Sequence, residues 1–120
     1  MERVAIPVFN TRVAPVLDIS NRLIVVDFED GQEVDRRELS LEKMSLLERI
    51  EALSRLEVHC VICAAISETM SRLMENKKIG LIRGVVGELD KIIHAYLCNR
   101  LDDSCFAMPG MLKPVAKKIR

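Results

Sequence analysis

The chain has 120 residues, of which 49% are hydrophobic and 30% charged, and its basic and acidic side chains balance to a formal net charge of zero. This length and apolar content fit a single domain with a packed core, and they exclude disorder of the whole chain. Three phenylalanines, one tyrosine and no tryptophan offer few platforms for base stacking, so binding of single-stranded nucleic acid is not expected.

The first forty residues carry the period of β-strands. Strands are predicted at residues 3–9, 21–29 and 32–39, with an irregular segment at residues 10–20. Asp30 and Gly31 lie between the second and third strands, and this pair favours a two-residue hairpin turn because both positions tolerate positive φ. The third strand is polar, which suits the edge of a sheet and discourages pairing with a second molecule.

From residue 41 the pattern alternates between helical and strand periods. Helices are predicted at residues 41–56, 67–76 and 87–101, with strands at residues 58–64 and 79–86. Ser40 or Ser45 can cap the first helix, and Ser45 also forms a capping-box pair with Glu48. Ser67 can cap the second helix, and Gly87 opens the third.

This order of elements predicts an α/β fold, with one mixed β-sheet of five strands flanked by three helices. We place a single domain at residues 1–110 and a basic C-terminal tail, with four basic and no acidic side chains, at residues 111–120. Ligands of such folds bind at the carboxyl ends of the central strands. The segments that follow those ends, called the rim below, are residues 10–13, 63–67 and 84–87.

The sequence also indicates the compartment. Its longest apolar stretch without a formal charge, residues 58–67, is much shorter than the roughly 20 residues that cross a bilayer, and the N-terminus does not resemble a signal peptide. Four cysteines in such a chain are typical of a reducing environment, where thiols are buried, reactive or metal-bound rather than paired. We therefore expect a cytoplasmic protein without a membrane segment.

The cysteines raise the question of metal or redox chemistry. Cys60 and Cys63 form a C-x-x-C pair, but an offset of three within a predicted strand directs them to opposite faces. Cys60 is expected to fill the core, whereas for Cys63, where the strand reaches the rim, both packing and a functional role stay open. Asp90, His94 and Cys98 follow at four-residue steps on the last predicted helix. This spacing permits metal binding, but without a second histidine or a C-x-x-C partner it favours a solvated stripe beside the apolar one.

Enzyme signatures are missing from the sequence. It contains no glycine-rich phosphate loop followed by Lys-Ser or Lys-Thr, no G-x-S-x-G elbow and no H-E-x-x-H. The order of elements is also that of ribonuclease-H-like nucleases, whose two-metal chemistry needs clustered carboxylates. The predicted strands R-V-A-I-P-V-F and V-H-C-V-I-C-A carry none, so we expect a protein that is not an enzyme.

Several short motifs carry a resemblance to a known family. They are F-N-T-R-V-A-P-V-L-D-I-S-N-R-L-I-V-V-D-F-E-D-G, V-I-C-A-A-I-S, Y-L-C-N-R-L and F-A-M-P-G, in this order. Through them the chain resembles the dinitrogenase iron–molybdenum cofactor biosynthesis family over residues 3–111. The resemblance implies a ribonuclease-H-like fold without the nuclease site. It also implies binding of the iron–molybdenum cofactor or its iron–sulfur precursor, which family members carry between assembly proteins.

The resemblance further implies a set of site residues on the rim. The cofactor-binding candidates are Asn10, Arg12, Cys63, Ala64, Ser67 and Gly87, with Cys63 as the metal ligand. The segment C-A-A-I-S from Cys63 matches the family's C-G-G/A-I-S, whereas Arg12 stands where nitrogenase-linked members have the histidine of N-x-H-F-G. An arginine fork binds anions bidentately, a thiolate suits iron, and backbone N–H groups near Ser67 and Gly87 would add to an anion site.

We therefore expect a non-catalytic carrier domain for an iron–molybdenum or iron–sulfur metallocluster or its precursor. Its expected partners are cofactor-assembly proteins or a metalloenzyme recipient, and the polar edge strand favours a monomer or weak homodimer. Two alternatives stay open. One is a metal-free protein-interaction or regulatory module that kept the fold and lost the site. The other is a binder of an oxyanion or small metabolite at the same rim.

Overall fold

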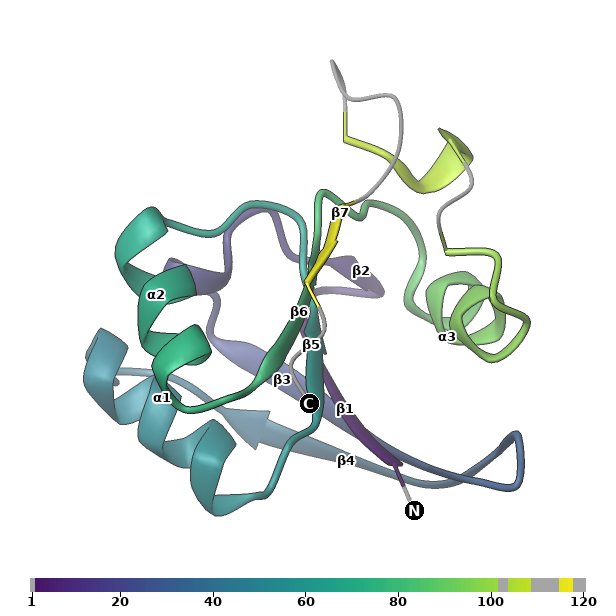
Figure 1. The fold of residues 1–120 in the computed structure, drawn as a ribbon. Helices are drawn as coiled ribbons and strands as arrows, with labels where there is room; N and C mark the ends of the chain where they lie inside the picture. The colour runs from purple at the N-terminus through teal and green to yellow at the C-terminus, as the bar shows by residue number, and fades with distance from the viewer. Residues whose placement is uncertain (1, 102–103, 109–114, 118–120) are drawn as a thin grey trace.

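The computed structural model describes residues 2–101, 104–108 and 115–117. Its strands are β1 (Glu2–Phe9), β2 (Arg12–Val13), β3 (Arg22–Glu29), β4 (Gln32–Ser40), β5 (Cys60–Ile62), β6 (Gly80–Arg83) and β7 (Val115–Lys117). Its helices are α1 (Leu46–Arg55), α2 (Glu68–Asn76) and α3 (Leu89–Leu97), with short 3-10 helices η1 (Leu17–Ile19) and η2 (Ser104–Phe106). Helices α1 and α2 cover one face of the sheet and α3 covers the other (Figure 1). The predicted mixed α/β fold class is confirmed.

Strand β1 lies in the middle of the sheet, whose strand order is β4-β3-β1-β5-β6-β7. It runs antiparallel to β3 and parallel to β5, and β5 runs parallel to β6. The carboxyl ends of β1, β5 and β6 therefore meet at one end of the sheet, which brings the rim segments together. Strand β4 forms an exposed edge, as its polar sequence predicts.

The sheet has more strands than the five predicted from the sequence. Strand β2 lies in the segment predicted to be irregular and pairs antiparallel with the end of β1. Two residues are too few to show an alternating pattern, so the sequence carries no sign of it. Strand β7 lies in the predicted basic tail and pairs antiparallel with β6; the other residues of that tail lie outside the described residues.

Local capping signals decide where the helices begin. Helix α1 begins later than predicted because Ser45, not Ser40, is its N-cap. The Oγ of Ser45 accepts the N–H of Glu48 and a carboxylate oxygen of Glu48 accepts the N–H of Ser45, each at 3.2 Å, which is the predicted capping box. Helix α3 begins two residues after Gly87 and ends before residue 101, since Asn99 turns the chain with a φ of 56°.

The sheet separates two hydrophobic clusters. The face under α3 buries Val4, Ile6, Cys60, Ile62 and Ile92, among others. The face under α1 and α2 buries Ala5, Val61, Cys63, Met70 and Met74, among others. Cys60 and Cys63 thus point to opposite faces, as the strand offset predicts, and Cys60 fills the core. No helix in the described part of the chain is long and apolar enough to cross a bilayer.

Candidate functional site

Three loops that follow β1, β5 and β6 are joined to one another at the rim. Backbone N–H groups donate from Val13 to the carbonyl of Gly87 (3.0 Å), from Ala65 to Pro15 (3.0 Å) and from Gly84 to Ala64 (2.8 Å). Residues 84–87 are therefore bonded both to residues 10–13 and to residues 63–67. Residues 63–67 are also bonded to Pro15, just beyond the first segment. This arrangement follows from the parallel strands, whose carboxyl ends lie side by side.

Arg12 lies on the outer surface of the rim in an exposed ion pair. Its Nη1 donates to a carboxylate oxygen of Glu88 at 2.9 Å, and the two side chains are 57% and 41% exposed. The hydroxyl of Thr11 donates to the other oxygen of Glu88, also at 2.9 Å. Hydrogen bonds from Thr11 and Arg12 lower the pKa of Glu88, which is therefore an anion at neutral pH. The sequence did not single out Glu88.

Asn10 forms the turn between β1 and β2, with a φ of 56°, a conformation that asparagine tolerates better than most residues. Beside it lies a cavity of about 540 Å³, lined partly by Phe9 and Ile19. These two apolar side chains are 66% and 74% exposed. The rim is therefore flanked by an exposed apolar surface, which was not predicted from the sequence.

Cys63 lies beneath the rim rather than on it. Its side chain is fully buried in the cluster under α1 and α2, and burial raises the pKa of its thiol to about 12. Ala64, another predicted cofactor-binding residue, is buried too, and its carbonyl accepts the N–H of Gly84. A neutral, enclosed thiol is a poor ligand for a cluster arriving from solvent, so this environment argues against the predicted metal-ligand role.

Ser67 caps α2 as predicted, with its Oγ accepting the N–H of Met70 at 3.0 Å. An internal carboxylate already occupies the position that an anion would take at this helix start. The backbone N–H of Ser67 donates to Asp18 at 2.9 Å, and its hydroxyl donates to the second oxygen of Asp18. The helix N-terminus is thus neutralised from within the chain. Residue 18 lies in the segment predicted to be irregular, so its role at the start of α2 is visible only in the structure.

Gly87 has a structural reason to be glycine. Its φ of 138° is one that side-chain-bearing residues rarely adopt, and an added Cβ would lie 3.4 Å from Cδ1 of Ile92 and 3.7 Å from Phe106. Its carbonyl accepts the bond from Val13. Gly87 therefore shapes the loop between β6 and α3 and holds it against β2.

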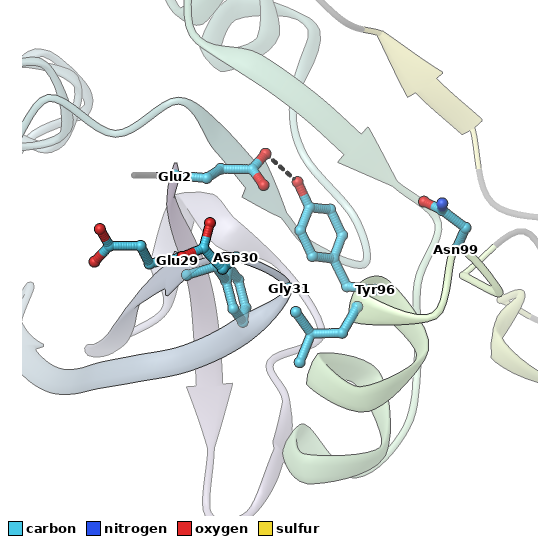
Figure 2. Close-up of a pocket in the computed structure, with 8 residues that line it drawn as sticks. Glu2, Glu29, Asp30, Gly31, Tyr96 and Asn99 are labelled. Carbon is cyan, nitrogen blue, oxygen red and sulfur yellow. Dashed lines mark hydrogen bonds between the residues drawn. The ribbon is translucent and has the colours of Figure 1, made fainter.

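The opposite end of β1 carries an acidic cavity of about 640 Å³. Glu2, Glu29 and Asp30 line it, and Tyr96 donates a hydrogen bond from its hydroxyl to Glu2 (Figure 2). Burial and this bond raise the pKa of Tyr96. Three carboxylates make this cavity unsuitable for an anion, so of the two ends of the sheet the rim is the better candidate for an anionic ligand.

The predicted stripe on α3 is only partly assembled. Cys98 Sγ lies 3.7 Å from Nε2 of His94, but the carboxylate of Asp90 instead accepts a bond from Arg36 at 2.8 Å. Within the described ranges, no three His, Cys, Asp or Glu side chains are grouped so as to hold a metal ion. A cluster at the rim would therefore be held by charge and hydrogen bonds rather than by a full set of protein ligands.

Comparisons with known proteins place the fold but not the function. No protein-family model matches the chain, and no curated protein matches it in sequence. Among solved structures, PH0822 superimposes with a TM-score of 0.80 at 16% identity, covering 92% of this chain and 96% of that one. A "putative dinitrogenase" from Methanocaldococcus jannaschii gives 0.70 at 16% identity, covering 82% and 89%.

A third similar structure is the apo form of the orange protein from Desulfovibrio gigas. Its TM-score is 0.69 at 12% identity, and the match covers 96% of this chain and 97% of that one. Identities this low establish a common fold alone. The name "putative dinitrogenase" of the second structure agrees with the family that the sequence motifs resemble, but at this identity it supports no more than that.

Proposed function

We propose that this chain is a non-catalytic domain of the iron–molybdenum cofactor biosynthesis type. It binds an anionic iron–molybdenum or iron–sulfur cluster, or its precursor, at the rim. Its partners are cofactor-assembly proteins or a metalloenzyme recipient in the cytoplasm. The observation that carries the proposal is the exposed guanidinium of Arg12, held at the point where the β1–β2 turn meets the β6–α3 loop.

The ion pair of Arg12 can be exchanged at little cost. Exposed ion pairs contribute about 0–1 kcal/mol, so an incoming anion that displaces Glu88 loses little. A hydrogen bond from the guanidinium to a cluster anion is charge-assisted, and two such bonds can form in parallel. The helix start at Ser67 is less accessible, because an anion there must first displace both hydrogen bonds of Asp18.

The irons of the cluster are already bridged by sulfide, so the protein need not supply a ligand to every coordination position of the metal. The protein contributes positive charge at Arg12 and a polar turn at Asn10, which suits a cargo that must be released again. Cys63 enters this proposal as a packing residue behind the rim, given its burial. Arg12 thus takes over, by charge, a position where nitrogenase-linked members use a histidine.

The test is anaerobic reconstitution with iron and sulfide, followed by absorption spectra and metal and sulfide analysis. Wild type is expected to retain a coloured cluster, and Arg12→Gln to weaken retention about ten- to a hundredfold, the equivalent of one charge-assisted bond. Arg55→Gln is the matched control, because it removes an exposed arginine at the far end of α1. Equal retention by Arg12→Gln and Arg55→Gln would contradict the proposal.

Cys63→Ala separates the two modes of binding. Unchanged retention per folded molecule is expected if the rim holds the cluster by charge. Loss of colour in Cys63→Ala, with Arg12→Gln unaffected, would assign the cluster to the buried thiol instead and overturn the role given to Arg12. Because a buried cysteine is removed, the folded fraction is measured first by circular dichroism.

The exposed apolar pair Phe9 and Ile19 favours a second candidate, a metal-free protein-interaction module. These side chains flank the 540 Å³ cavity next to Asn10, and exposed apolar surface of this kind marks protein contacts. Colourless wild type that still binds a cofactor-assembly protein would support this candidate. In that case Arg12→Gln leaves the complex intact and Phe9→Ser weakens it.

A further inference from the structure

A cavity of about 390 Å³ lies beside α3 and shares no residue with the rim. This volume is within the range of roughly 300–1,000 Å³ that is usual for small-ligand sites. Helix α3 contributes Lys91, His94 and Ala95 to its lining, and the chain that follows this helix contributes Arg100 and Phe106. The cavity is therefore large enough for a small molecule, and the proposed function gives it no role.

The spacing along α3 and the backbone beyond it explain how this lining comes together. His94 and Ala95 follow Lys91 by three and four residues, so the three side chains share one face of the helix. The segment that carries Phe106 is fixed to the β6–α3 loop, because the N–H of Val86 donates to the carbonyl of Phe106 at 2.8 Å. The cavity is therefore formed by a helix face on one side and by a segment held through its backbone on the other.

Basic side chains dominate the charge of this cavity. Lys91 and Arg100 are exposed, and both are cations at neutral pH. The acidic residue of the lining, Asp90, already accepts a hydrogen bond from Nη1 of Arg36 at 2.8 Å. Among the described residues, which leave out residues 102 and 103, no carboxylate forms an ion pair with Lys91 or Arg100. In this part of the chain, two positive charges are therefore available to an anion that enters the cavity.

We propose that this cavity binds a small organic carboxylate with an apolar or aromatic body. The guanidinium of Arg100 can hold a carboxylate through two parallel hydrogen bonds, and Lys91 adds a second positive charge. The ring of Phe106 and the methyl group of Ala95 give the body of the ligand an apolar surface to pack against. Because the ligand must match both parts, a bare inorganic anion and a neutral aromatic molecule each fit the cavity less well.

The charge of the neighbouring cavity supports this assignment. Other residues of α3, Tyr96 and Leu97, line the acidic cavity of about 640 Å³ together with Glu2 and Glu29. That cavity repels carboxylates, so an anion that approaches α3 is directed to the basic cavity. Arg12 lines neither cavity. The proposal therefore goes beyond the proposed function and can fail independently of it.

The experiment is an NMR titration of the isotope-labelled full chain with benzoate, benzamide and acetate. Benzoate carries both the ring and the carboxylate, benzamide has the ring without the charge, and acetate has the charge without the ring. With benzoate, saturable shifts of the backbone amide signals are expected at residues 90–95 and 104–106. The other two probes should bind about tenfold more weakly or worse, because each lacks either the charge-assisted hydrogen bonds or the apolar contact.

Arg100→Gln is expected to weaken benzoate binding about ten- to a hundredfold, because it removes charge-assisted hydrogen bonds to the carboxylate. Arg55→Gln is the matched control, since it removes an exposed arginine from α1, on the face of the sheet opposite to α3 (Figure 1). It changes the net charge of the protein by the same amount and should leave benzoate binding unchanged. The folded fraction of both variants is measured first by circular dichroism.

Several outcomes would overturn the proposal. One is a wild-type protein that shows no saturable shifts with benzoate, and another is benzamide or acetate that binds as tightly as benzoate. Equal affinities of Arg100→Gln and Arg55→Gln for benzoate would reveal a general attraction to positive charge rather than a site. Shifts confined to residues 10–13 would assign the carboxylate to the rim instead of the cavity.

Discussion

Replacing Asp27 by asparagine is expected to destabilise the fold through one largely buried ion pair. Arg3 on β1 and Asp27 on β3 are direct cross-strand partners. Arg3 donates to the two carboxylate oxygens at 2.7 and 3.3 Å. The aspartate side chain is 8% exposed and the arginine 22%, so the asparagine variant leaves a guanidinium that water reaches only in part.

The magnitude follows from this partial burial. Removing one partner of a fully buried pair costs about 3–5 kcal/mol; because Arg3 regains some hydration, we expect about 2 kcal/mol at pH 7. In thermal unfolding this corresponds to roughly 6–10 °C for a chain of this length. Asp35→Asn is the control, because residue 35 pairs with Arg37 while half exposed, and it should change the free energy of unfolding by less than about 1 kcal/mol.

The pH dependence gives the sharper test. The hydrogen bond from Arg3 lowers the pKa of Asp27 below its ordinary value. Its contribution is therefore fully present above the unfolded pKa of about 4 and is lost as pH falls through the lower folded pKa. In urea unfolding, the difference in the free energy of unfolding between wild type and Asp27→Asn should become smaller in acid. Two results would refute the reasoning. One is a difference in the free energy of unfolding below about 1 kcal/mol at neutral pH, and the other is a difference that is as large in acid as at neutral pH.

Three further outcomes are expected. Gly87→Ala forces a side chain into a φ of 138° and should lower the free energy of unfolding by roughly 1–3 kcal/mol, measured by thermal unfolding; no change would contradict the assigned strain. Asp18→Ala removes both acceptors of Ser67 and should cost about 1–2 kcal/mol, with faster hydrogen exchange in the first turn of α2. Burial raises the pKa of the Cys63 thiol to about 12, and Cys60 is buried as well. A thiol reagent at pH 8 should therefore label two cysteines in the native protein and four in urea. Rapid labelling of a third cysteine in the native protein would contradict the burial.

The fold was predictable where short-range chemistry sets an element's limits. Asp30 and Gly31 both have positive φ, as the hairpin turn requires, and the Ser45–Glu48 box starts α1. Such signals act within a few residues and are visible in the sequence. Strands β2 and β7 were not predicted, because two or three residues are too few to show an alternating pattern. Strand β7 is in addition defined by its pairing with β6, which is remote in the sequence.

The location of the candidate site was predictable from the sequence, but the pairing of its side chains with one another was not. Parallel strands bring the rim segments together, which the order of elements implies. What neutralises each group depends on contacts that are remote in sequence, such as Arg12 with Glu88 and Ser67 with Asp18. The depth of Cys63 has the same origin, because the chain around Pro15 bonds to Ala65 and closes over that end of β5.

The central position of β1 has a consequence for how the chain folds. Strand β1 precedes the other strands of this sheet in the sequence. It pairs on one side with β3, which follows soon after, and on the other side with β5, through the register of Val4 with Cys60. The hydrogen bonds between β1 and β5 must wait until the chain between them has been made and its ends have been brought together, a loop closure with an entropic cost. Contacts of such long range slow folding. Until β5 arrives, a nascent chain presents the part of β1 around Val4 and Ala5 without its partner strand on that side.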